Sequence, residues 1–294
     1  MKKVIKPGRA RKSINFIDNI VYSRQKDLEG NEMELKMSIM LQNGNSEMRL
    51  ASGHDDEADD KTPKPAILWV PGGGYRGCDK NLMVAEMAFL ADAGYVVASM
   101  YYRSSAEAHM PSQIIDVKTS IRFLRAHADE YEIDPDRIGV MGESAGGYLT
   151  CMAALATDPV YDVGENLEYS SAVQAACPWY PPTDFRGFPY SDPEQCAASP
   201  ESLLMGKNVM RHPEEALACC PVSFVTKAAP PFLIIHGEND HTVPFGQGEE
   251  LHDELEKAGC DVTLLSIEDA DHADLRFFQK EVWDEICAFF RAKL

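Results

Sequence analysis

The sequence predicts an α/β fold in which a mostly parallel sheet carries helices on both faces. Short apolar runs, typical of strands buried on both faces, alternate with amphipathic helical segments from residue 66 onward. The composition is that of a globular protein, with 45% hydrophobic and 26% charged residues in 294. We expect a single domain over residues 1–294, with an N-terminal β extension at 1–65 and an insertion at about 181–230.

The N-terminal extension is predicted to consist of antiparallel strands. A short apolar run at 20–23 indicates one strand, and residues 33–41 alternate apolar and polar side chains as a half-buried strand does. The polar stretch 42–65 follows and holds an acidic run at 55–60. That run lacks the glycine and final glutamate of a calcium loop, so it favours a solvated hairpin loop over a metal site.

The rest of the chain supplies the strands and helices of the main sheet. Five apolar runs predict its buried strands, at residues 66–70, 95–100, 137–141, 232–235 and 261–265. Helical spacing places two sets of apolar side chains on single helix faces, namely Ile114, Val117, Ile121 and Leu124, and Phe278, Val282, Ile286 and Phe289. The insertion lies before the penultimate central strand and is expected to form a lid or cap of short helices.

Charge and cysteine content exclude several classes of protein. A net charge of −19 argues against nucleic acid and anionic membranes as partners. No apolar run is long enough to span a bilayer, and no apolar segment follows the basic N-terminus as in a secretory signal. The eight cysteines form no C-x-x-C pair and are expected to be reduced packing thiols, which predicts a cytoplasmic protein.

The strongest chemical signal is the pattern Gly-x-Ser-x-Gly at residues 142–146. A buried strand runs directly into it and a helix is predicted directly after it, at 148–156. This strand–turn–helix setting is that of a nucleophile elbow, where small neighbours leave room for a strained serine. The alternative is a glycine-rich turn in which Ser144 only caps the helix. The elbow is favoured because the other parts of a catalytic site are also present.

A second glycine-rich segment, at residues 71–75, follows the first central strand. Acyl transfer places negative charge on a carbonyl oxygen, which needs backbone N–H donors close to it. Gly73 and Gly74 in this loop, together with Ala145 after the serine, are the predicted donors of an oxyanion hole. The alternative is a phosphate-binding loop, but the segment lacks the Lys-Ser/Thr ending and does not match G-x-G-x-x-G.

A serine nucleophile needs a histidine base, and His272 is the predicted one among eight histidines. It lies between the fifth central strand and the final helix, which places it at the same sheet edge as Ser144. His241 is the competing candidate because it also follows a strand, but it adjoins the predicted acid. His236 ends a strand and is expected to be a core histidine with its hydrogen bonds satisfied.

Asp240 is the predicted acid, since it follows the fourth central strand and would orient the imidazole. Glu238 is a weaker candidate, and Asp271 beside His272 is expected to be a loop charge. The chain order serine, aspartate, histidine is the order of one fold class and differs from that of chymotrypsin or subtilisin.

These motifs give the sequence a resemblance to the α/β-hydrolase superfamily, and most of all to small carboxylesterases of the acetyl esterase, feruloyl esterase and hormone-sensitive-lipase-like groups. It rests on the Gly-Gly-Gly loop, on residues 101–103, 142–147 and 230–237 with Asp240, and on Asp271-His272. It covers the chain from about residue 66 to the end. In the glycine loop, Pro71 stands where many relatives have histidine.

The resemblance implies a serine carboxylester hydrolase acting on acetyl or hydroxycinnamoyl (feruloyl) esters of carbohydrates. Ser144 would be the nucleophile, Asp240 the acid and His272 the base. Partners would be a small-molecule or oligosaccharide ester and, in one possible assembly, a second copy of the chain. No metal and no cofactor is expected. Aromatic residues could contact the substrate or could merely pack the insertion, namely Tyr75, Trp179, Tyr180, Phe185, Phe188 and Tyr190.

Two alternatives remain open at the level of sequence. A peptidase of the prolyl-oligopeptidase type shares the elbow and the order of the triad, but 65 N-terminal residues are too few for its propeller domain. A catalytically inactive binding protein on the same fold would be expected to lack a member of the triad, and all three are present here.

Overall fold

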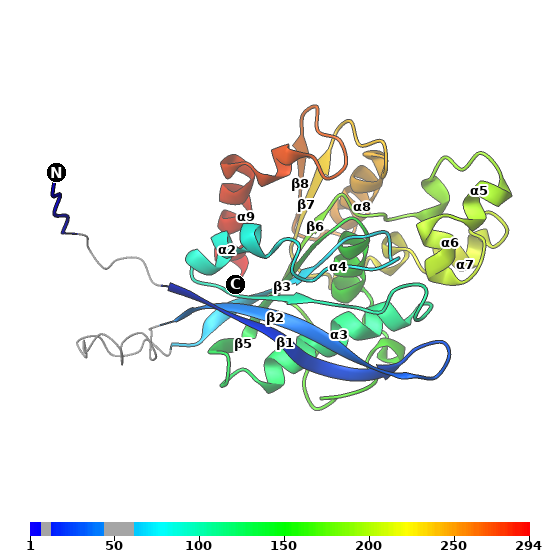
Figure 1. Ribbon diagram of the computed structural model, residues 1–294. Helices are drawn as coiled ribbons and strands as arrows, with labels where there is room; N and C mark the ends of the chain where they lie inside the picture. Colours follow the sequence, from blue (N-terminus) through cyan, green and yellow to red (C-terminus); the bar gives the residue numbers. More distant parts are fainter. Residues whose placement is uncertain (7–12, 44–61) are drawn as a thin grey trace.

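The computed structural model describes residues 1–6, 13–43 and 62–294, and centres on one eight-stranded sheet (Figure 1). The strand order is β1-β2-β4-β3-β5-β6-β7-β8. The first two pairings, β1 with β2 and β2 with β4, are antiparallel, and every later neighbouring pair is parallel. The strands are β1 (Ser13–Lys26), β2 (Glu32–Asn43), β3 (Lys64–Val70), β4 (Val96–Met100), β5 (Ile133–Glu143), β6 (Ala175–Trp179), β7 (Phe232–Gly237) and β8 (Val262–Ile267). The predicted fold class is confirmed.

Helices cover both faces of this sheet, and each face has its own apolar core. One core includes buried side chains of α3 (Ser112–Ala126), α4 (Ala145–Leu155) and α8 (Gly246–Lys257). The other includes those of α2 (Val84–Asp92) and α9 (Lys280–Lys293). The strands of the sheet centre are therefore buried from both sides, which explains their continuous apolar runs.

The N-terminal strands join the same sheet, but one expectation about them is wrong. The predicted strands at 20–23 and 33–41 are parts of the longer β1 and β2. The stretch 42–65 does not close a hairpin, because β4 lies between β2 and β3. Its acidic run at 55–60 falls outside the described residues.

The sequence prediction missed β6, the strand between β5 and β7. This strand is five residues long, reads Ala-Ala-Cys-Pro-Trp and is fully buried. It contains a proline and none of the β-branched residues that mark a strand. Its partners on both sides supply the pairing that its own sequence does not indicate.

The buried face of the last helix also differs from the expected one. In α9 the buried residues are Val282, Trp283, Ile286 and Phe290. Phe278 precedes the helix, in η4 (Leu275–Phe278), and Phe289 is only half-buried. Because the helix begins at Lys280, Trp283 and Phe290 lie on its buried face in place of Phe278 and Phe289.

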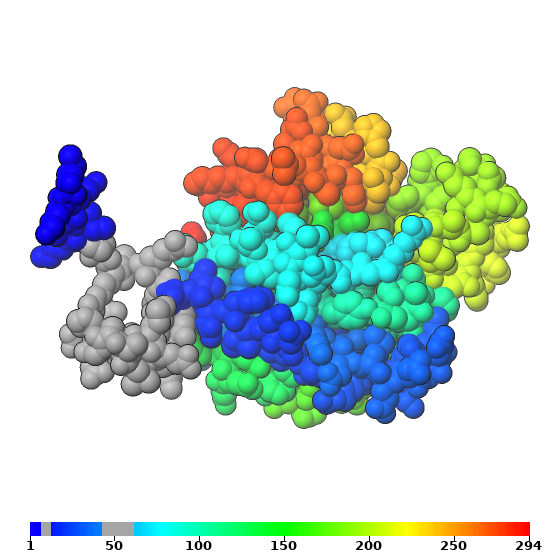
Figure 2. Space-filling view, viewed as in Figure 1, coloured from blue at the N-terminus to red at the C-terminus, as the bar shows by residue number. Residues whose placement is uncertain are grey.

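The segment between β6 and β7 forms a lobe at one side of the molecule (Figure 2). It holds only short helices, η2 (Phe185–Gly187), α5 (Pro193–Ala197), α6 (Pro200–Met205), α7 (Pro213–Leu217) and η3 (Pro221–Phe224). A further short helix, η1 (Pro159–Tyr161), follows α4. No helix in the described part of the chain has the length and apolarity needed to cross a membrane.

Candidate active site

Ser144 stands on a sharp turn between β5 and α4. Its backbone adopts φ 53° and ψ −119°, a conformation that costs energy for any residue other than glycine. The turn passes so close to the end of β3 that a side chain on Gly142 or Gly146 would overlap the carbonyl oxygen of Val70. The helix begins at Ala145, three residues earlier than predicted, so the serine hydroxyl lies directly at its N-terminus.

Three of the predicted residues are joined by hydrogen bonds at the carboxyl edge of the sheet. His272 Nε2 lies 2.9 Å from Ser144 Oγ, and His272 Nδ1 lies 2.8 Å from Asp240 Oδ2. With Nδ1–H donating to the carboxylate, Nε2 is free to accept the serine proton. The three residues come from the ends of β5, β7 and β8, which meet at this edge.

The Asp240 carboxylate is held as an anion beneath the imidazole. Burial alone would raise the pKa of Asp240, but hydrogen bonds from His236, His272 and the backbone, with the attraction of His272, bring it well below its ordinary value. Its Oδ1 accepts the backbone N–H groups of Thr242 and Val243 at 2.8 and 2.7 Å. The acid is therefore fixed in place and charged throughout the neutral pH range.

His236 is buried as expected, but its hydrogen bonds are only half satisfied. Nε2 lies 3.0 Å from the carbonyl oxygen of Val243 and 3.4 Å from Asp240 Oδ2. Nδ1 has no hydrogen-bond partner within the described residues. His236 thus lies against the Asp240 carboxylate within the core and stabilises its negative charge.

The other candidates for base and acid do not join this chain of hydrogen bonds. His241 is exposed and pairs with Asp271. Asp271 is more than a loop charge, because its Oδ1 accepts the backbone N–H groups of His241 and His272 at 2.9 and 2.7 Å. It therefore ties the loop after β7 to the loop after β8. Glu238 is exposed and belongs to neither contact.

The predicted oxyanion donors line the cavity that also contains Ser144. Gly73 and Gly74 have φ of 125° and 59°, which glycine adopts readily, and both line the same cavity as Ser144 and Ala145. Ala145 is the first residue of α4, so its N–H has no acceptor within the helix. The Tyr102 hydroxyl donates to the carbonyl oxygen of Pro71 at 2.9 Å and so anchors the start of the loop.

The cavity over the serine has a volume of about 530 Å³. Its walls come from the glycine loop, the elbow, the insertion and the loops after β7 and β8. The lining residues are Gly73, Gly74, Tyr75, Glu143, Ser144, Ala145, Pro182, Phe188, Tyr190, Ser199, Pro200, Glu201, Thr242, Val243, His272 and Ala273. It is of a size that suits a small ligand.

Of the six aromatic residues named as candidate substrate contacts, Tyr75, Phe188 and Tyr190 line this cavity. The prediction that Trp179 contacts substrate is wrong. Its ring is fully buried against Trp69, Phe277 and Trp283, as expected of the last residue of a central strand. Its place in the core explains its size and aromatic character.

Tyr180 is also buried and supports the site from behind. Its hydroxyl donates to Glu143 Oε2 at 2.6 Å, and its ring contacts the His272 imidazole edge-on with centroids 4.5 Å apart. Among the other aromatics, Phe185 packs on Tyr148 in the core, whereas Phe188 and Tyr190 line the cavity. Glu143 and Glu201 were missed as lining residues. The elbow pattern could have indicated Glu143, but no sequence signal indicates Glu201.

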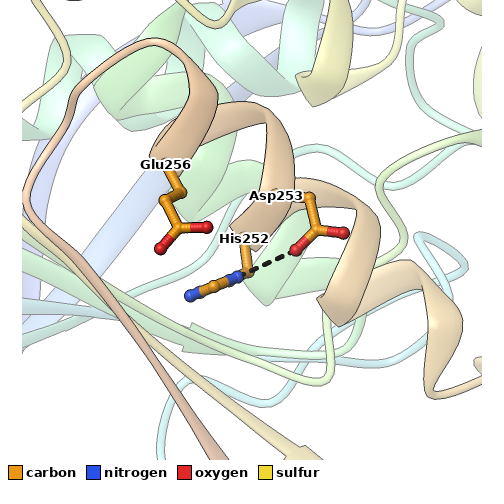
Figure 3. Close-up of side chains that lie close together, drawn as sticks. All are labelled: His252, Asp253 and Glu256. Carbon is orange, nitrogen blue, oxygen red and sulfur yellow. Dashed lines mark hydrogen bonds and ion pairs between the residues drawn. The ribbon is translucent and has the colours of Figure 1, made fainter.

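One group of side chains elsewhere could hold a metal ion. His252, Asp253 and Glu256 lie together on α8, with His252 Nδ1 3.1 Å from Asp253 Oδ1 (Figure 3). Asp253 and Glu256 are exposed, and none of the three lines the cavity over Ser144. An exposed grouping of this kind is common on acidic helices and has no link to the serine site.

A family model named BD-FAE matches residues 56–255. The chain belongs to the BD-FAE family. The BD-FAE match includes Ser144 and Asp240 and ends before His272. The predicted resemblance to carboxylesterases of the α/β-hydrolase superfamily is confirmed by this match and by the esterases described next.

Two curated relatives are esterases of Mycobacterium tuberculosis (strain ATCC 25618 / H37Rv). Esterase LipQ is 32% identical over 212 residues, which cover 71% of this chain and 50% of LipQ. Esterase LipC is 32% identical over 213 residues, which cover 71% of this chain and 53% of LipC. The chain thus spans about half the length of these relatives.

Solved structures of esterases share the fold over nearly the whole chain. A truncated form of a carbohydrate esterase from gut microbiota is 27% identical, with 98% of both chains covered and a TM-score of 0.79. Esterase Est2 of Thermogutta terrifontis, solved with butyrate bound, is 23% identical, with 97% of this chain and 94% of that chain covered and a TM-score of 0.69. The Est2 likeness concerns the fold alone.

Proposed function

We propose that this BD-FAE family member is a serine carboxylester hydrolase that forms an acyl-enzyme. The observation that carries the proposal is the hydrogen-bonded chain of Ser144, His272 and Asp240 at a cavity that two glycines of an oxyanion loop also line. Its relatives among esterases support the same class of reaction.

In the proposed reaction, Ser144 Oγ attacks the ester carbonyl carbon while His272 Nε2 takes the hydroxyl proton. Asp240 holds the imidazole and stabilises the imidazolium that forms. The N–H groups of Ala145 and of Gly73 or Gly74 bind the oxyanion, and one such donor is worth about 10²–10³ in rate. His272 then protonates the leaving alcohol, and water releases the acid by the same steps.

We further propose that the substrates are acetyl or hydroxycinnamoyl esters of carbohydrates. The truncated carbohydrate esterase from gut microbiota, similar over 98% of its chain, supports a sugar ester. Phe188 and Tyr190 support it too, because their rings stack with centroids 5.9 Å apart and both line the cavity. Such an aromatic surface can pack against a sugar ring or an aryl acyl group.

The proposed nucleophile is tested by replacing Ser144 with alanine. Ser144→Ala should lower kcat for p-nitrophenyl acetate about 10⁵-fold or more, because the whole triad depends on the nucleophile. Ser191→Ala, at an exposed serine of the insertion, is the matched control and should keep full activity. Circular dichroism would check that both variants fold. Retained hydrolysis by Ser144→Ala would rule out this assignment.

A serine peptidase remains the second candidate function. The acylamino-acid-releasing enzyme of Rattus norvegicus is 27% identical over 232 residues, which cover 73% of this chain and 29% of that enzyme. An acylated amino-acid anilide assayed beside p-nitrophenyl acetate separates the two functions, since a peptidase would cleave the amide at a comparable rate. An inactive binding protein, the third candidate, would cleave neither.

We also propose that residues 1–294 form one domain in a reducing, cytoplasmic setting. The first part is supported by β1 and β2, which pair into the sheet that carries the serine. The second is supported by the cysteines, all eight of which are free thiols.

A further inference from the structure

A buried carboxylate forms part of the wall of the active-site cavity. Glu201, the second residue of α6, lines the cavity although the residue is only 4% exposed. Its Oε2 accepts a hydrogen bond from the Tyr190 hydroxyl at 2.8 Å. A carboxylate can accept about four hydrogen bonds, so acceptor capacity remains at the cavity wall.

This carboxylate is costly to bury. Burial raises the pKa of Glu201, and hydrogen bonds from its own backbone, Tyr190 and Ser199, with the attraction of Arg76, oppose that rise only in part. Within the described part of the chain, Glu201 makes no ion pair within 4.0 Å. A buried and poorly compensated acid in a cavity is a feature of ligand sites more than of structural ones.

The part of α6 that carries Glu201 lies against the oxyanion loop. A Cβ on Gly74 would be only 3.5 Å from Pro200 Cγ, and the Arg76 side chain donates to the carbonyl oxygen of Ala198 at 2.6 Å. These contacts fix the start of α6 beside the loop that would bind the oxyanion. Glu201 therefore lines the same cavity as Ser144 and Gly74.

The neighbours of Glu201 define what it could bind. Tyr190, its hydrogen-bond donor, stacks on Phe188 with an angle of 17° between the rings. An aromatic face beside a hydrogen-bond acceptor matches a ring that has apolar faces and hydroxyl groups at its edge.

We propose that Glu201 and Tyr190 form a subsite in which the Glu201 carboxylate accepts a hydrogen bond from a hydroxyl group of the ester substrate. The inference rests on the proposed ester hydrolysis and names the substrate feature that the site selects. The hydroxyl belongs to a sugar ring or to the phenol of a hydroxycinnamoyl group. An ester without a hydroxyl leaves the remaining acceptor capacity of the buried carboxylate unused, which selects against that ester.

The test compares kcat/KM within two pairs of esters that differ in their hydroxyl groups. A monoacetylated methyl xyloside is paired with cyclohexyl acetate, and methyl ferulate is paired with methyl 3,4-dimethoxycinnamate. The variants are Glu201→Gln, which keeps the shape but removes the charge, and Tyr190→Phe, which removes the donor that positions the carboxylate. Glu194→Gln is the matched control, since Glu194 also follows the first proline of a short insertion helix but is exposed.

For the wild type we expect a preference for the hydroxylated ester in at least one pair. Glu201→Gln should reduce this preference about tenfold, because a neutral amide oxygen replaces the charged acceptor and makes a weaker hydrogen bond. Tyr190→Phe should reduce it in the same pair, and Glu194→Gln should leave it unchanged. The pair that responds tells whether the hydroxyl comes from the sugar or from the phenol.

Other outcomes overturn the subsite. A preference that neither variant changes would overturn it. An equal fall in kcat/KM for both esters of a pair would also overturn it, because such a fall indicates a structural role. If Glu201→Gln fails to fold in a thermal melt, Tyr190→Phe decides alone. A wild type that hydrolyses p-nitrophenyl acetate without preference in either pair refutes the subsite but leaves ester hydrolysis standing. A wild type that hydrolyses no ester refutes both.

Discussion

At the scale of single residues, the strained turn at Ser144 depends on neighbours that have no side chain. Gly146 leads from this turn into α4 and packs against the end of β3, where a Cβ would overlap the Val70 carbonyl oxygen. The backbone atoms on both sides belong to central elements and have little freedom to move apart. The glycine is therefore needed for close packing, in addition to any role of the serine in chemistry.

Gly146→Ala should consequently lower the free energy of unfolding by about 1–3 kcal/mol, the usual cost of forcing extra atoms into a packed interior. Denaturation in urea would measure it. The matched control is Gly246→Ala at the start of α8, where a Cβ would have open space, and it should change stability by less than about 1 kcal/mol. Equal effects at the two sites would contradict the packing argument.

Asp240 provides a prediction that depends on pH. Its pKa is lowered in the folded protein, so its ionised form stabilises the fold above the unfolded pKa of about 3.9. Asp240→Asn should be less stable than the wild type at pH 7, and the difference should shrink as the pH falls below about 4. Asp253→Asn, at an exposed carboxylate of α8, is the control and should show a much smaller difference.

The same variant should also lose activity. Asparagine cannot favour the imidazole tautomer with Nδ1–H, and the comparable change in serine proteases lowers kcat by about 10⁴. If the Asp240→Asn variant hydrolyses p-nitrophenyl acetate at a near-normal rate, Asp240 does not act as the triad acid.

The residues of the hydrogen-bonded chain could be predicted because each follows a strong local pattern. Ser144 lies in a five-residue motif, Asp240 follows the buried strand β7, and His272 follows the apolar run of β8, which the structure shows as a partly exposed edge strand. Glu201 and the role of Asp271 could not be predicted. Both depend on which loops the fold brings together, and nothing in the sequence near Glu201 shows that α6 reaches the oxyanion loop.

At the scale of elements, the insertion is attached to the core through buried hydrogen bonds. Gln247 on α8 accepts the backbone N–H groups of Thr183 and Asp184 at 2.7 and 2.8 Å through its side-chain oxygen. In the middle of the insertion, the Leu204 carbonyl oxygen of α6 accepts the N–H of Met110 at 3.0 Å. These contacts favour a fixed wall of the cavity over a moving lid.

Gln247→Leu should therefore destabilise the protein by about 2–4 kcal/mol, because two buried N–H groups lose their acceptor. Hydrogen exchange should show the largest increase in residues 182–188. Glu249→Leu places the same side chain at an exposed position of α8 and should change stability by less than about 1 kcal/mol. If exchange in the insertion is already fast in the wild type, the fixed wall is wrong.

The arrangement of elements was predictable where a strand carries its own apolar run. It was not predictable where neighbours supply the stability. The strand β6 is held in the sheet by its pairing with β5 and β7. The strand β2 pairs with β4, although β3 is the next strand along the chain. Both depend on contacts between distant segments, which a local pattern of side chains does not contain.

At the scale of the whole molecule, the cysteines report how completely the fold excludes solvent. Cys78 lies after the oxyanion loop, Cys177 in β6 at the sheet centre, and Cys220 within the insertion, between α7 and η3. Burial raises the pKa of Cys78 and of Cys220 to about 12, and raises that of Cys177 as well. A thiol with a pKa of 12 has about one part in 10⁴ as reactive thiolate at pH 8.

We therefore expect iodoacetamide at pH 8 to label these three cysteines at least about 100-fold more slowly in the native protein than in guanidinium, where the pKa returns to about 8.5. Peptide mapping by mass spectrometry gives the rate at each site. If the chain folds as the single domain proposed above, the slow labelling of the three thiols should speed up together as denaturant approaches the unfolding midpoint. Early labelling of Cys220 alone would show that the insertion opens separately from the sheet.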